Sequence, residues 1–367
     1  MKKVENNKRF AEKLLDWYDQ SQKRDLPWKA TQNPYHIWLS EIILQQTRVE
    51  QGKPYYLRFI EKYPTLKELA AAEEAEVMKI WQGLGYYSRA RNMLETAKYI
   101  DKEHHAIFPN QYDQIRKLKG IGDYTAAAIA SFAFNLPHAV VDGNVFRVLS
   151  RCFGISTAID SGAGKKTFTQ LANSLLSVER PADFNQAIMD LGAVICTPAS
   201  PKCKACPFSE ECQASQNNSV AEYPVKSKKL TKKNRYFYYF VWKGYDNQTI
   251  LKKRTEKDIW RGLFDFPLME TDKTLSSDND YQEIWSSETW KNWNGSTEKP
   301  NVFKISPSFQ QVLTHQNILV IFVEIMDAIP IFFENHEHFF CTTIDSVNQF
   351  ALPKTINSYV QLNYFSK

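Results

Sequence analysis

Four of the six cysteines lie in one short stretch, and this stretch limits the fold more than any other feature. They follow the pattern C-x6-C-x2-C-x5-C, at Cys196, Cys203, Cys206 and Cys212. Four thiolates on one loop suit a tetrahedral metal ion or a cubane iron–sulfur cluster. No apolar segment follows the first residues, Met-Lys-Lys-Val-Glu. We therefore expect no secretory signal, and clustered cysteines then favour metal over disulfides. On composition alone, zinc and an iron–sulfur cluster are equally compatible with the loop.

The chain length sets the scale of the protein. With 367 residues, one or two domains are expected, with a core that needs no disulfide bonds. The apolar run Ile318 to Val323 stops at Glu324 and is too short to span a bilayer. These features predict a soluble protein of the cytoplasm without a membrane partner.

Charge is distributed unevenly along the chain. Residues 1–235 hold 34 Lys/Arg and 25 Asp/Glu, whereas residues 236–367 hold 12 and 16. A basic first part indicates contact with a polyanion such as nucleic acid. An ordinary solvated surface is the alternative explanation.

The residue pattern changes near residue 235. Before it, apolar residues recur at helical spacing, for example in Arg9–Tyr18, Ile37–Gln45, Glu74–Trp81 and Val145–Phe153. After it, Tyr236–Trp242 and Ile318–Val323 are aromatic and β-branched, as strands are. We predict a helical domain over 1–220, a basic linker over 221–234 and an α/β domain over 235–367. Linker lysines are Lys226, Lys228, Lys229, Lys232 and Lys233.

A glycine hairpin and an aspartate follow one another at a fixed distance. Leu118-Lys-Gly-Ile-Gly-Asp-Tyr124 places Gly120 and Gly122 between two apolar segments. Such glycines allow a tight turn, and the following helix offers its first amides to phosphate. This pattern is typical of a helix-hairpin-helix, here about 112–134, although a plain turn between helices has the same glycines. Twenty residues after Gly122 comes Asp142, which by itself would be a helix N-cap.

Two further segments carry unusual residues for their surroundings. Glu41 stands in the apolar run Trp38-Leu-Ser-Glu-Ile-Ile-Leu-Gln-Gln-Thr47. A buried carboxylate is costly, so either this glutamate faces solvent or it has a function. In Gly83-Leu-Gly-Tyr-Tyr-Ser-Arg-Ala-Arg91, aromatic residues stand between glycines and arginines. That mixture suits a wedge in a base stack, and it also suits a simple turn.

These segments, in this order, resemble the MutY family of adenine DNA glycosylases, within the helix-hairpin-helix glycosylase superfamily. The resemblance nearly fills residues 24–212 and includes the 6-2-5 cysteine spacing, which in this family binds a [4Fe–4S] cluster. It implies a mainly α, two-lobed glycosylase domain with the cluster loop, and a Nudix-like α/β C-terminal domain. It also implies a monomer that removes adenine paired with 8-oxoguanine or guanine in double-stranded DNA and leaves an abasic site.

The resemblance also implies roles for individual residues. Glu41 would be the general acid, with a pKa that its apolar neighbours raise toward neutrality. Asp142 would stabilise positive charge on the deoxyribose, with Tyr124 and Asn144 beside the sugar. Arg24, Trp28 and Asp190 would shape the adenine pocket together with Glu41. Lys29 stands where many relatives have arginine, and Asp190 stands where many have glutamate.

Tyr124 distinguishes two branches of the superfamily. At this position, glycosylases that also cut the strand carry a lysine, which forms a Schiff base. Tyrosine has no amine, so we expect base removal without efficient lyase activity. The alternatives are a bifunctional pyrimidine glycosylase, a zinc-bearing DNA-binding protein and a Nudix hydrolase. The last of these lacks its run of carboxylates here.

The resemblance extends to DNA and to the oxidised base. Tyr86 would insert beside 8-oxoguanine, joined by Leu84, Gln46 and Thr47. Backbone phosphates would meet the hairpin at Gly120 and Gly122 and the cysteine loop at Lys202 and Lys204. Ile259-Trp-Arg-Gly-Leu-Phe-Asp-Phe-Pro267 resembles the Nudix-like domain. Thr314 and His315 stand where the family's 8-oxoguanine sensor usually reads Phe-Ser-His.

Overall fold

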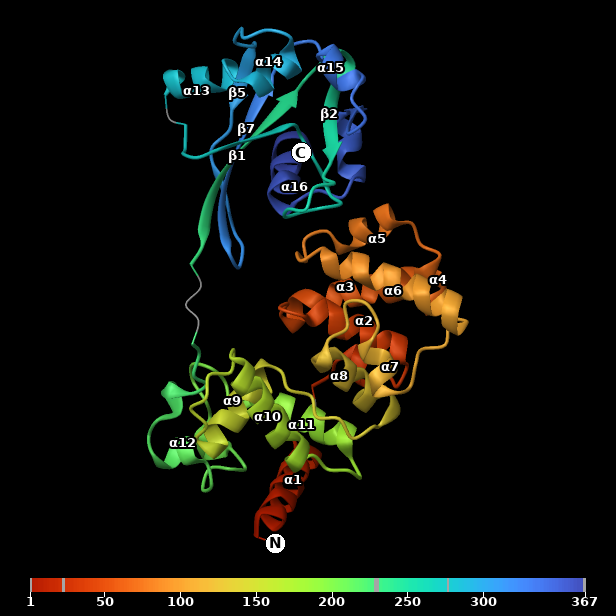
Figure 1. Ribbon diagram of the computed structural model, residues 1–367, viewed down its shortest axis with the longest axis vertical. Coiled ribbons are helices and arrows are strands. Elements are labelled where there is room, and N and C mark those ends of the chain that lie inside the picture. The colour runs from red at the N-terminus through yellow and green to blue at the C-terminus, as the bar shows by residue number, and fades with distance from the viewer. Residues whose placement is uncertain (1, 22–23, 228–230, 276, 366–367) are drawn as a thin grey trace. The chain divides into compact units, whose positions relative to one another are not determined.

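The computed structural model describes residues 2–21, 24–227, 231–275 and 277–365, and the chain divides into two compact units (Figure 1). The first comprises Met1–Ala71 and Asn92–Lys229, and the second comprises Ala72–Arg91 and Leu230–Lys367. Residues 72–91 thus pack with the second unit although they lie within the range 1–220 of the predicted helical domain. Lys228 and Lys229, which the predicted linker includes, lie outside the described residues.

The first unit is built from helices, as the sequence predicts. They are α1 (Lys2–Gln20), α2 (Pro34–Leu44), α3 (Val49–Lys62), α4 (Leu66–Ala70), the larger part of α6 (Ser88–His104), α7 (Tyr112–Arg116), α8 (Asp123–Phe134), α9 (Gly143–Phe153), α10 (Gly162–Leu175), α11 (Pro181–Val194) and α12 (Gln213–Gln216). Short 3-10 turns are η1 (Pro27–Lys29), η2 (Cys203–Ala205) and η3 (Val220–Glu222). Within the described residues of this unit, no strand occurs.

Side-chain caps set the start of several of these helices. The Asn33 side chain accepts a hydrogen bond from the Tyr35 amide at 2.9 Å, and Pro34 follows at the first helical position of α2. Asp142 caps α9 in the same way through the Val145 amide. Such caps satisfy amides that have no partner within the helix, and each contributes about 1 kcal/mol. The caps therefore fix where α2 and α9 begin.

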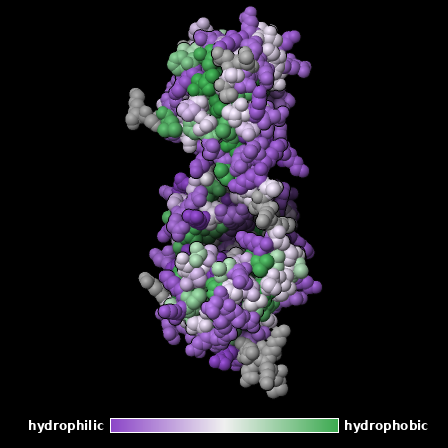
Figure 2. Space-filling view, turned by 90° about the vertical axis from the view of Figure 1, so that its left-hand side faces the viewer, coloured by the Kyte–Doolittle hydropathy of each residue, from purple (hydrophilic) through white to green (hydrophobic). Residues whose placement is uncertain are grey.

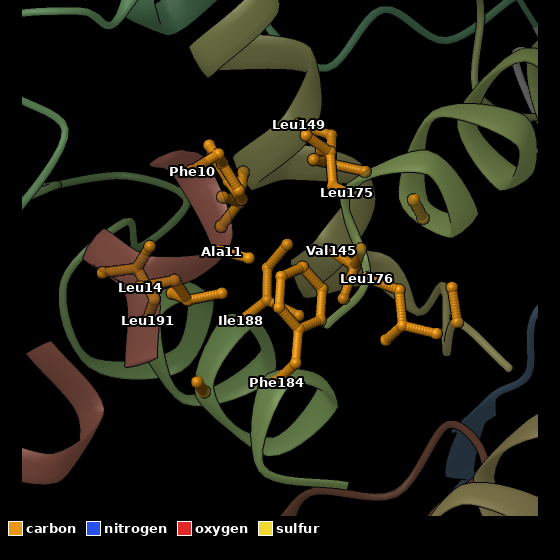
Figure 3. Close-up of a cluster of buried hydrophobic side chains, with 14 of the residues drawn as sticks. Phe10, Ala11, Leu14, Val145, Leu149, Leu175, Leu176, Phe184, Ile188 and Leu191 are labelled. Carbon is orange, nitrogen blue, oxygen red and sulfur yellow. The ribbon is translucent and has the colours of Figure 1, made fainter. Parts of the chain in front are cut away.

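One hydrophobic cluster joins α1, α9, α10 and α11 (Figure 3). Phe10 and Leu14 from α1 meet Leu149 from α9 and Phe184 and Ile188 from α11. Each fully buried side chain of this size contributes roughly 1.5–3 kcal/mol. The ring of Phe208 stacks on Phe10 with centroids 4.3 Å apart, so the cysteine loop is anchored to the same core.

A second contact brings α2 against α8. Ala126, Ala128 and Ala130 of α8 are fully buried, and Trp38 of α2 is fully buried as well. Small side chains on one helix let the backbone of the other come close. This packing places Glu41 of α2 near the start of α8.

The second unit contains two sheets. The larger has the strand order β4-β1-β7-β5 with β6 also paired to β7, and the smaller has the order β3-β2-β8. The strands are β1 (Lys233–Trp242), β2 (Gln248–Lys253), β3 (Phe264–Asp265), β4 (Leu268–Thr271), β5 (Val302–Ile305), β6 (Phe309–Val312), β7 (Gln316–Ile325) and β8 (Phe339–Thr343). The helices are α5 (Glu74–Trp81), the start of α6, α13 (Asp278–Trp285), α14 (Glu288–Asn294), α15 (Ile331–Glu334) and α16 (Lys354–Val360). Two 3-10 segments, η4 (Tyr245–Asn247) and η5 (Ile344–Gln349), and one π-helical segment, η6 (Gln361–Phe365), complete the unit.

Strand β1 is buried on both faces. It runs parallel to β7, with Phe237 opposite Val320. On one face, Phe240 and Trp242 pack against the tryptophans of α14, and on the other the Tyr239 ring stacks on Phe322 with centroids 5.6 Å apart. A continuous apolar run is the pattern of a strand covered on both sides. The sequence prediction of an α/β domain in this region is confirmed.

Residues 72–91 are held to the rest of the second unit by polar contacts as well. The Lys79 ammonium donates to the carbonyl oxygens of Asn348 and Phe350, the latter at 3.0 Å. The Gln82 amide nitrogen donates to Asn357 Oδ1 at 2.7 Å. These hydrogen bonds join residues 72–91 to residues of the C-terminal part of the chain that are far away in the sequence.

Hydrophilic side chains cover most of the surface seen in Figure 2, and hydrophobic ones show as small patches. Among the residues that the structure describes, no helix combines the length and apolar character that crossing a bilayer requires.

Candidate active site

A cavity of about 170 Å³ in the first unit gathers most of the predicted catalytic residues. This volume is several times the roughly 30 Å³ that a water molecule occupies in the liquid. The lining side chains come from η1, α2, α8, α9 and α11 and from the residues next to them. Among the predicted residues, the cavity is lined by Arg24, Trp28, Glu41, Thr47, Tyr124, Asp142, Asn144 and Asp190.

Glu41 lies inside α2 with its side chain turned to this cavity. It is 6% exposed, and the Tyr124 hydroxyl donates to its Oε2 at 2.8 Å. Burial raises the pKa of Glu41 to about 7, although the hydrogen bond from Tyr124 acts in the opposite direction. A carboxyl group with this pKa is partly protonated at neutral pH, so Glu41 can donate a proton.

Asp142 faces the same cavity in a different environment. Its Oδ1 accepts from the Val145 amide at 2.8 Å, and its Oδ2 accepts from the Asn144 side chain at 2.8 Å. Burial raises the pKa of Asp142, and these hydrogen bonds lower it in part. Donors on both oxygens fix the carboxylate in place and favour its charged form. The cavity thus holds Glu41, whose pKa burial raises to about 7, and Asp142, whose two oxygens accept hydrogen bonds.

Arg147, one turn further along α9, supports Asn144. Its Nη2 donates to Asn144 Oδ1 at 2.8 Å and to the Gly192 carbonyl at 2.7 Å, and its Nε donates to the Cys196 carbonyl at 2.7 Å. The sequence analysis did not select Arg147. The available signal was an arginine three residues after Asn144, and hence on the same face of an amphipathic helix.

Asp190 of α11 is paired with two cations. The Lys29 ammonium lies 2.6 Å from its Oδ2, and Arg24 Nη1 lies 3.6 Å from its Oδ1. Asp190 therefore holds these two side chains at the cavity wall. Gln186, one turn earlier on α11, lines the cavity too and was not selected from the sequence. Its spacing of four residues from Asp190 is the signal that places it on this face.

The glycine hairpin joins α7 to α8. Gly120 adopts a φ of +77°, where a side chain would be strained, and a Cβ there would lie 2.8 Å from Asn92. Gly122 is exposed and its Cα faces open space. Two cations near the turn form ion pairs within the protein, Arg116 with Asp123 and Lys119 with Glu95.

The cysteine loop follows α11 and is tied to α9. All four cysteines of the C-x6-C-x2-C-x5-C pattern line one cavity. Arg151 of α9 is 2% exposed and donates to the Thr197 carbonyl at 2.8 Å and to Cys196 Sγ at 3.4 Å. Lys202 and Lys204 are exposed on the loop. The loop therefore presents thiols inward and ammonium groups outward.

A second, larger cavity of about 450 Å³ lies within the second unit. Leu84 and Tyr86 line it together with Thr314 and His315. The Tyr86 hydroxyl contacts that of Thr314, and Tyr86 adopts a φ of +47°, an unfavourable conformation for a bulky residue. The structure thus gathers four of the six residues predicted to meet the oxidised base.

The other two residues of that prediction belong to the first unit. Thr47 lines the cavity of Glu41. Gln46 is exposed, with a φ of +57°.

Comparison with known proteins identifies the family. Residues 39–174 match the model of the HhH-GPD superfamily of base excision DNA repair proteins. A curated adenine DNA glycosylase of Buchnera aphidicola is 33% identical over 352 residues, which cover 96% of this chain and 97% of that protein. The chain belongs to the adenine DNA glycosylase family.

Solved structures agree with the fold of this adenine DNA glycosylase. A thermostable thymine-DNA glycosylase is 31% identical, with a TM-score of 0.54, over 58% of this chain and 98% of that one. An endonuclease III–DNA complex has a TM-score of 0.51 at 20% identity, over 59% of this chain and 97% of that one. The predicted helix-hairpin-helix glycosylase fold is confirmed.

Family membership gives the reaction class for the cavity around Glu41. An adenine DNA glycosylase of base excision repair cleaves the bond between adenine and deoxyribose. A partly protonated carboxyl group beside a hydrogen-bonded carboxylate suits this cleavage, because the leaving base needs a proton and the sugar develops positive charge. The roles of individual residues remain predictions, and they are developed below.

Proposed function

We propose that this adenine DNA glycosylase excises adenine paired with 8-oxoguanine or guanine in double-stranded DNA and leaves an abasic site. It acts as a monomer on chromosomal DNA in the cytoplasm. The observation that carries the proposal is Glu41, buried in a cavity, hydrogen-bonded to Tyr124 and facing Asp142.

The reaction begins with access to the base. Adenine within a duplex is out of reach, so it is flipped out of the stack into the cavity. Glu41 then protonates N7 of adenine, which turns the base into a neutral leaving group. Because burial raises the pKa of Glu41 to about 7, the proton is available at neutral pH.

Bond cleavage leaves positive charge on the deoxyribose. Asp142, held by the Val145 amide and the Asn144 side chain, stabilises this charge from a fixed position. Water then attacks the sugar and completes the abasic site. Arg147 keeps Asn144 in place by its bond to Oδ1.

Tyr124 supports a monofunctional reaction. Its hydroxyl donates to Glu41, and burial raises the pKa of Tyr124 well above its usual value. The group therefore stays a neutral hydrogen-bond donor and offers no amine for a Schiff base. Trapping of an enzyme–DNA adduct by borohydride would contradict this assignment and favour the bifunctional branch.

The second unit is the proposed reader of 8-oxoguanine, as a Nudix-like domain that binds without hydrolysis. Its cavity offers aromatic surface from Tyr86 and Trp260 and polar groups from Thr314 and His315. Aromatic side chains stack on bases, and hydroxyl and imidazole groups read their edges. The chain carries no Nudix-type run of carboxylates in this region.

A [4Fe–4S] cluster is the proposed cofactor of the cysteine loop. All four cysteines line one cavity. Four thiolates on one loop suit a cubane, in which each thiolate binds its own iron.

The 6-2-5 cysteine spacing, which resembles the [4Fe–4S] loop of the family, supports the cluster over zinc. Cys196, Cys203, Cys206 and Cys212 would hold it. A bound cluster would hold the cysteine loop in one conformation. Lys202 and Lys204 on the outside of this loop would then contact DNA phosphates. Iron and broad visible absorption in the purified protein test the cofactor, and stoichiometric zinc would contradict it.

Single-turnover release of adenine tests the catalytic proposal. Duplexes carrying 8-oxoguanine:A, guanine:A and thymine:A are compared for the wild type, Glu41→Gln and Glu61→Gln. Glu61 is an exposed glutamate of α3 and serves as the matched control. We expect release from the first two duplexes only, unchanged by Glu61→Gln and reduced by roughly 10²–10⁴-fold or more by Glu41→Gln. Near-normal release by Glu41→Gln would refute the acid role.

A further inference from the structure

One wall of the larger cavity is a loop between β2 and β3 of the second unit. The cavity is lined by four consecutive residues of this loop, Asp258, Ile259, Trp260 and Arg261. Backbone hydrogen bonds join the two ends of the loop. The Arg254 amide donates to the Leu263 carbonyl at 2.8 Å, and the Gly262 amide donates to the Arg254 carbonyl at 2.7 Å. The wall therefore begins and ends beside fixed points of the smaller sheet.

The side chain of Arg254 is buried behind this wall and contacts it directly. Its Nε donates to the Ile259 carbonyl at 3.1 Å, and its Nη2 donates to Asp258 Oδ2 at 3.1 Å. Its Nη1 donates at 2.7 Å to Oδ2 of Asp265, a fully buried residue of β3. Arg235 also binds Asp258, through two hydrogen bonds of 2.9 Å. One guanidinium group thus ties two residues of the wall to a buried carboxylate.

Trp260, the next residue of the wall, has an unfavourable backbone conformation. Its φ is +60°, which is rare for a bulky side chain. Its ring lies 6.0 Å from the Arg254 guanidinium carbon and meets the Phe237 ring edge to face, with centroids 5.9 Å apart. A strained conformation persists only where surrounding contacts hold it, and such positions are common at ligand-binding sites. Arg254 thus contacts three consecutive residues of the wall.

We propose that Arg254 is a positioning residue for the recognition of 8-oxoguanine, because it holds residues 258–260 in the conformation that shapes the cavity. The inference rests on the proposed reading of the oxidised base by the second unit. Arg254 does not line the cavity, so it acts through the wall and not by touching the base. Side chains that meet a ligand need neighbours that fix their geometry.

A purely stabilising role for Arg254 makes a different prediction. Desolvation offsets much of the attraction between Arg254 and Asp265, so this buried pair adds little net stability. Arg254→Lys keeps a positive charge opposite Asp265 but loses the planar fork that reaches Ile259 and Asp258. Asp265→Asn removes the charge of the partner and leaves the fork, since its amide oxygen still accepts. The two substitutions therefore separate the wall from the ion pair.

The test compares Arg254→Lys, Asp265→Asn and Lys253→Ala with the wild type, each as the full chain. Lys253 is the exposed neighbour of Arg254 and serves as the control. Single-turnover adenine release is measured on 8-oxoguanine:A and guanine:A below saturating enzyme, where the rate reports binding as well as cleavage, and thermal unfolding is followed in parallel. We expect Arg254→Lys to lower the ratio of the two rates about tenfold, as the loss of two ordinary hydrogen bonds does. Its rate on guanine:A stays close to that of the wild type. Asp265→Asn lowers the melting temperature and keeps the ratio, and Lys253→Ala changes neither.

The outcomes separate this inference from the proposed function. A wild type without any preference for 8-oxoguanine:A would overturn the proposed reading itself. A wild type with the preference and an unchanged ratio in Arg254→Lys overturns only the role of Arg254, and so does an equal fall of the ratio in Arg254→Lys and Asp265→Asn. If Arg254→Lys does not fold, Trp260→Gly decides, because glycine adopts the same φ without strain but removes the ring beside Arg254. An unchanged ratio in that variant overturns the inference.

Discussion

The two cavities of this protein differ in how their residues are held. In the first unit, Glu41 stands on α2 and Asp142 caps α9, and neighbouring donors fix their oxygens. In the second unit, Tyr86 stands on a strained turn and is 46% exposed, in a cavity more than twice as large. Bond cleavage needs groups fixed in advance, whereas reading a base tolerates a side chain that adjusts on contact. Substitutions in the first cavity should therefore slow every duplex alike, and those in the second should change the order among duplexes.

After Glu41→Gln, Asp142→Asn should give the largest effect among the substitutions that test this contrast. We expect base release to fall by about 10²–10³-fold on 8-oxoguanine:A and guanine:A alike, because a neutral amide does not stabilise the sugar cation. Asparagine caps a helix about as well as aspartate, so thermal unfolding should change little. Single-turnover kinetics and a melting curve measure the two quantities. An equally large loss of stability would point to capping as the main role.

The pH profile should show the protonation state of Glu41. Its pKa is raised from 4.5 to about 7, and the acid form is the active one. The rate of base release should therefore fall about tenfold per pH unit above pH 7. A rate that stays flat to pH 9 would assign the proton to another group.

The free energy of unfolding should also depend on the protonation of Glu41. Between pH 4.5 and 7 the folded protein holds a proton that the unfolded chain loses, so the free energy of unfolding declines as pH rises through this window. Above pH 7, where Glu41 is charged in the folded protein too, the free energy of unfolding is lower than at pH 4.5 by on the order of 3 kcal/mol. Glu41→Gln should remove this dependence, and urea titrations at pH 5 and pH 8 compare it with the wild type.

Tyr86→Ala should act on binding and on the choice of duplex. Loss of one stacking aromatic weakens binding by about 1–3 kcal/mol, which is roughly 5- to 150-fold in affinity. We expect a larger loss on 8-oxoguanine:A than on thymine:A, measured by fluorescence anisotropy. Tyr99→Ala, an exposed tyrosine of the first unit, is the control. Equal losses on both duplexes would mean that Tyr86 is a general DNA contact.

Thr314→Val should give the smallest effect. It removes the hydroxyl beside Tyr86 with little change in size. The loss of one hydrogen bond costs about 0.5–1.5 kcal/mol, so the preference for 8-oxoguanine:A over guanine:A should fall a few-fold. The ratio of the two single-turnover rates measures it. An unchanged ratio would place recognition on other residues of this cavity.

The sequence was most informative where a short pattern carries the chemistry. The apolar run around Glu41, the glycine hairpin with Tyr124 and the aspartate twenty residues later predicted residues that the fold brings into one cavity. Their helices pack through runs such as Ala126–Ala130, which are visible in the sequence as small apolar residues. The predicted change from helices to strands is confirmed for the same reason, because the spacing of apolar residues is local.

What the sequence could not supply depends on distant partners. Arg147 and Gln186 are ordinary polar residues of amphipathic helices until Asn144 and the cavity are placed beside them. Cys152 stands apart from the cysteine pattern in the sequence, and only the fold places it in the lining of the cavity that the four loop cysteines share. The attachment of residues 72–91 to the second unit rests on Lys79 and Gln82, whose partners lie more than 260 residues further along the chain.

That attachment also bears on how the protein is made. The ribosome synthesises residues 72–91 long before residues 348–357. During most of synthesis, Lys79 and Gln82 near the turn of Tyr86 therefore lack the carbonyl and amide groups that they later bind. Domains usually fold in order from the N-terminus during synthesis. The second unit cannot follow this order, because residues 72–91 are synthesised early and residues 230–367 late. Ending translation at the linker would therefore not yield a smaller version of the enzyme with an intact wedge. It would yield the first unit with residues 72–91 inserted in it and without the partners that these residues have in the second unit.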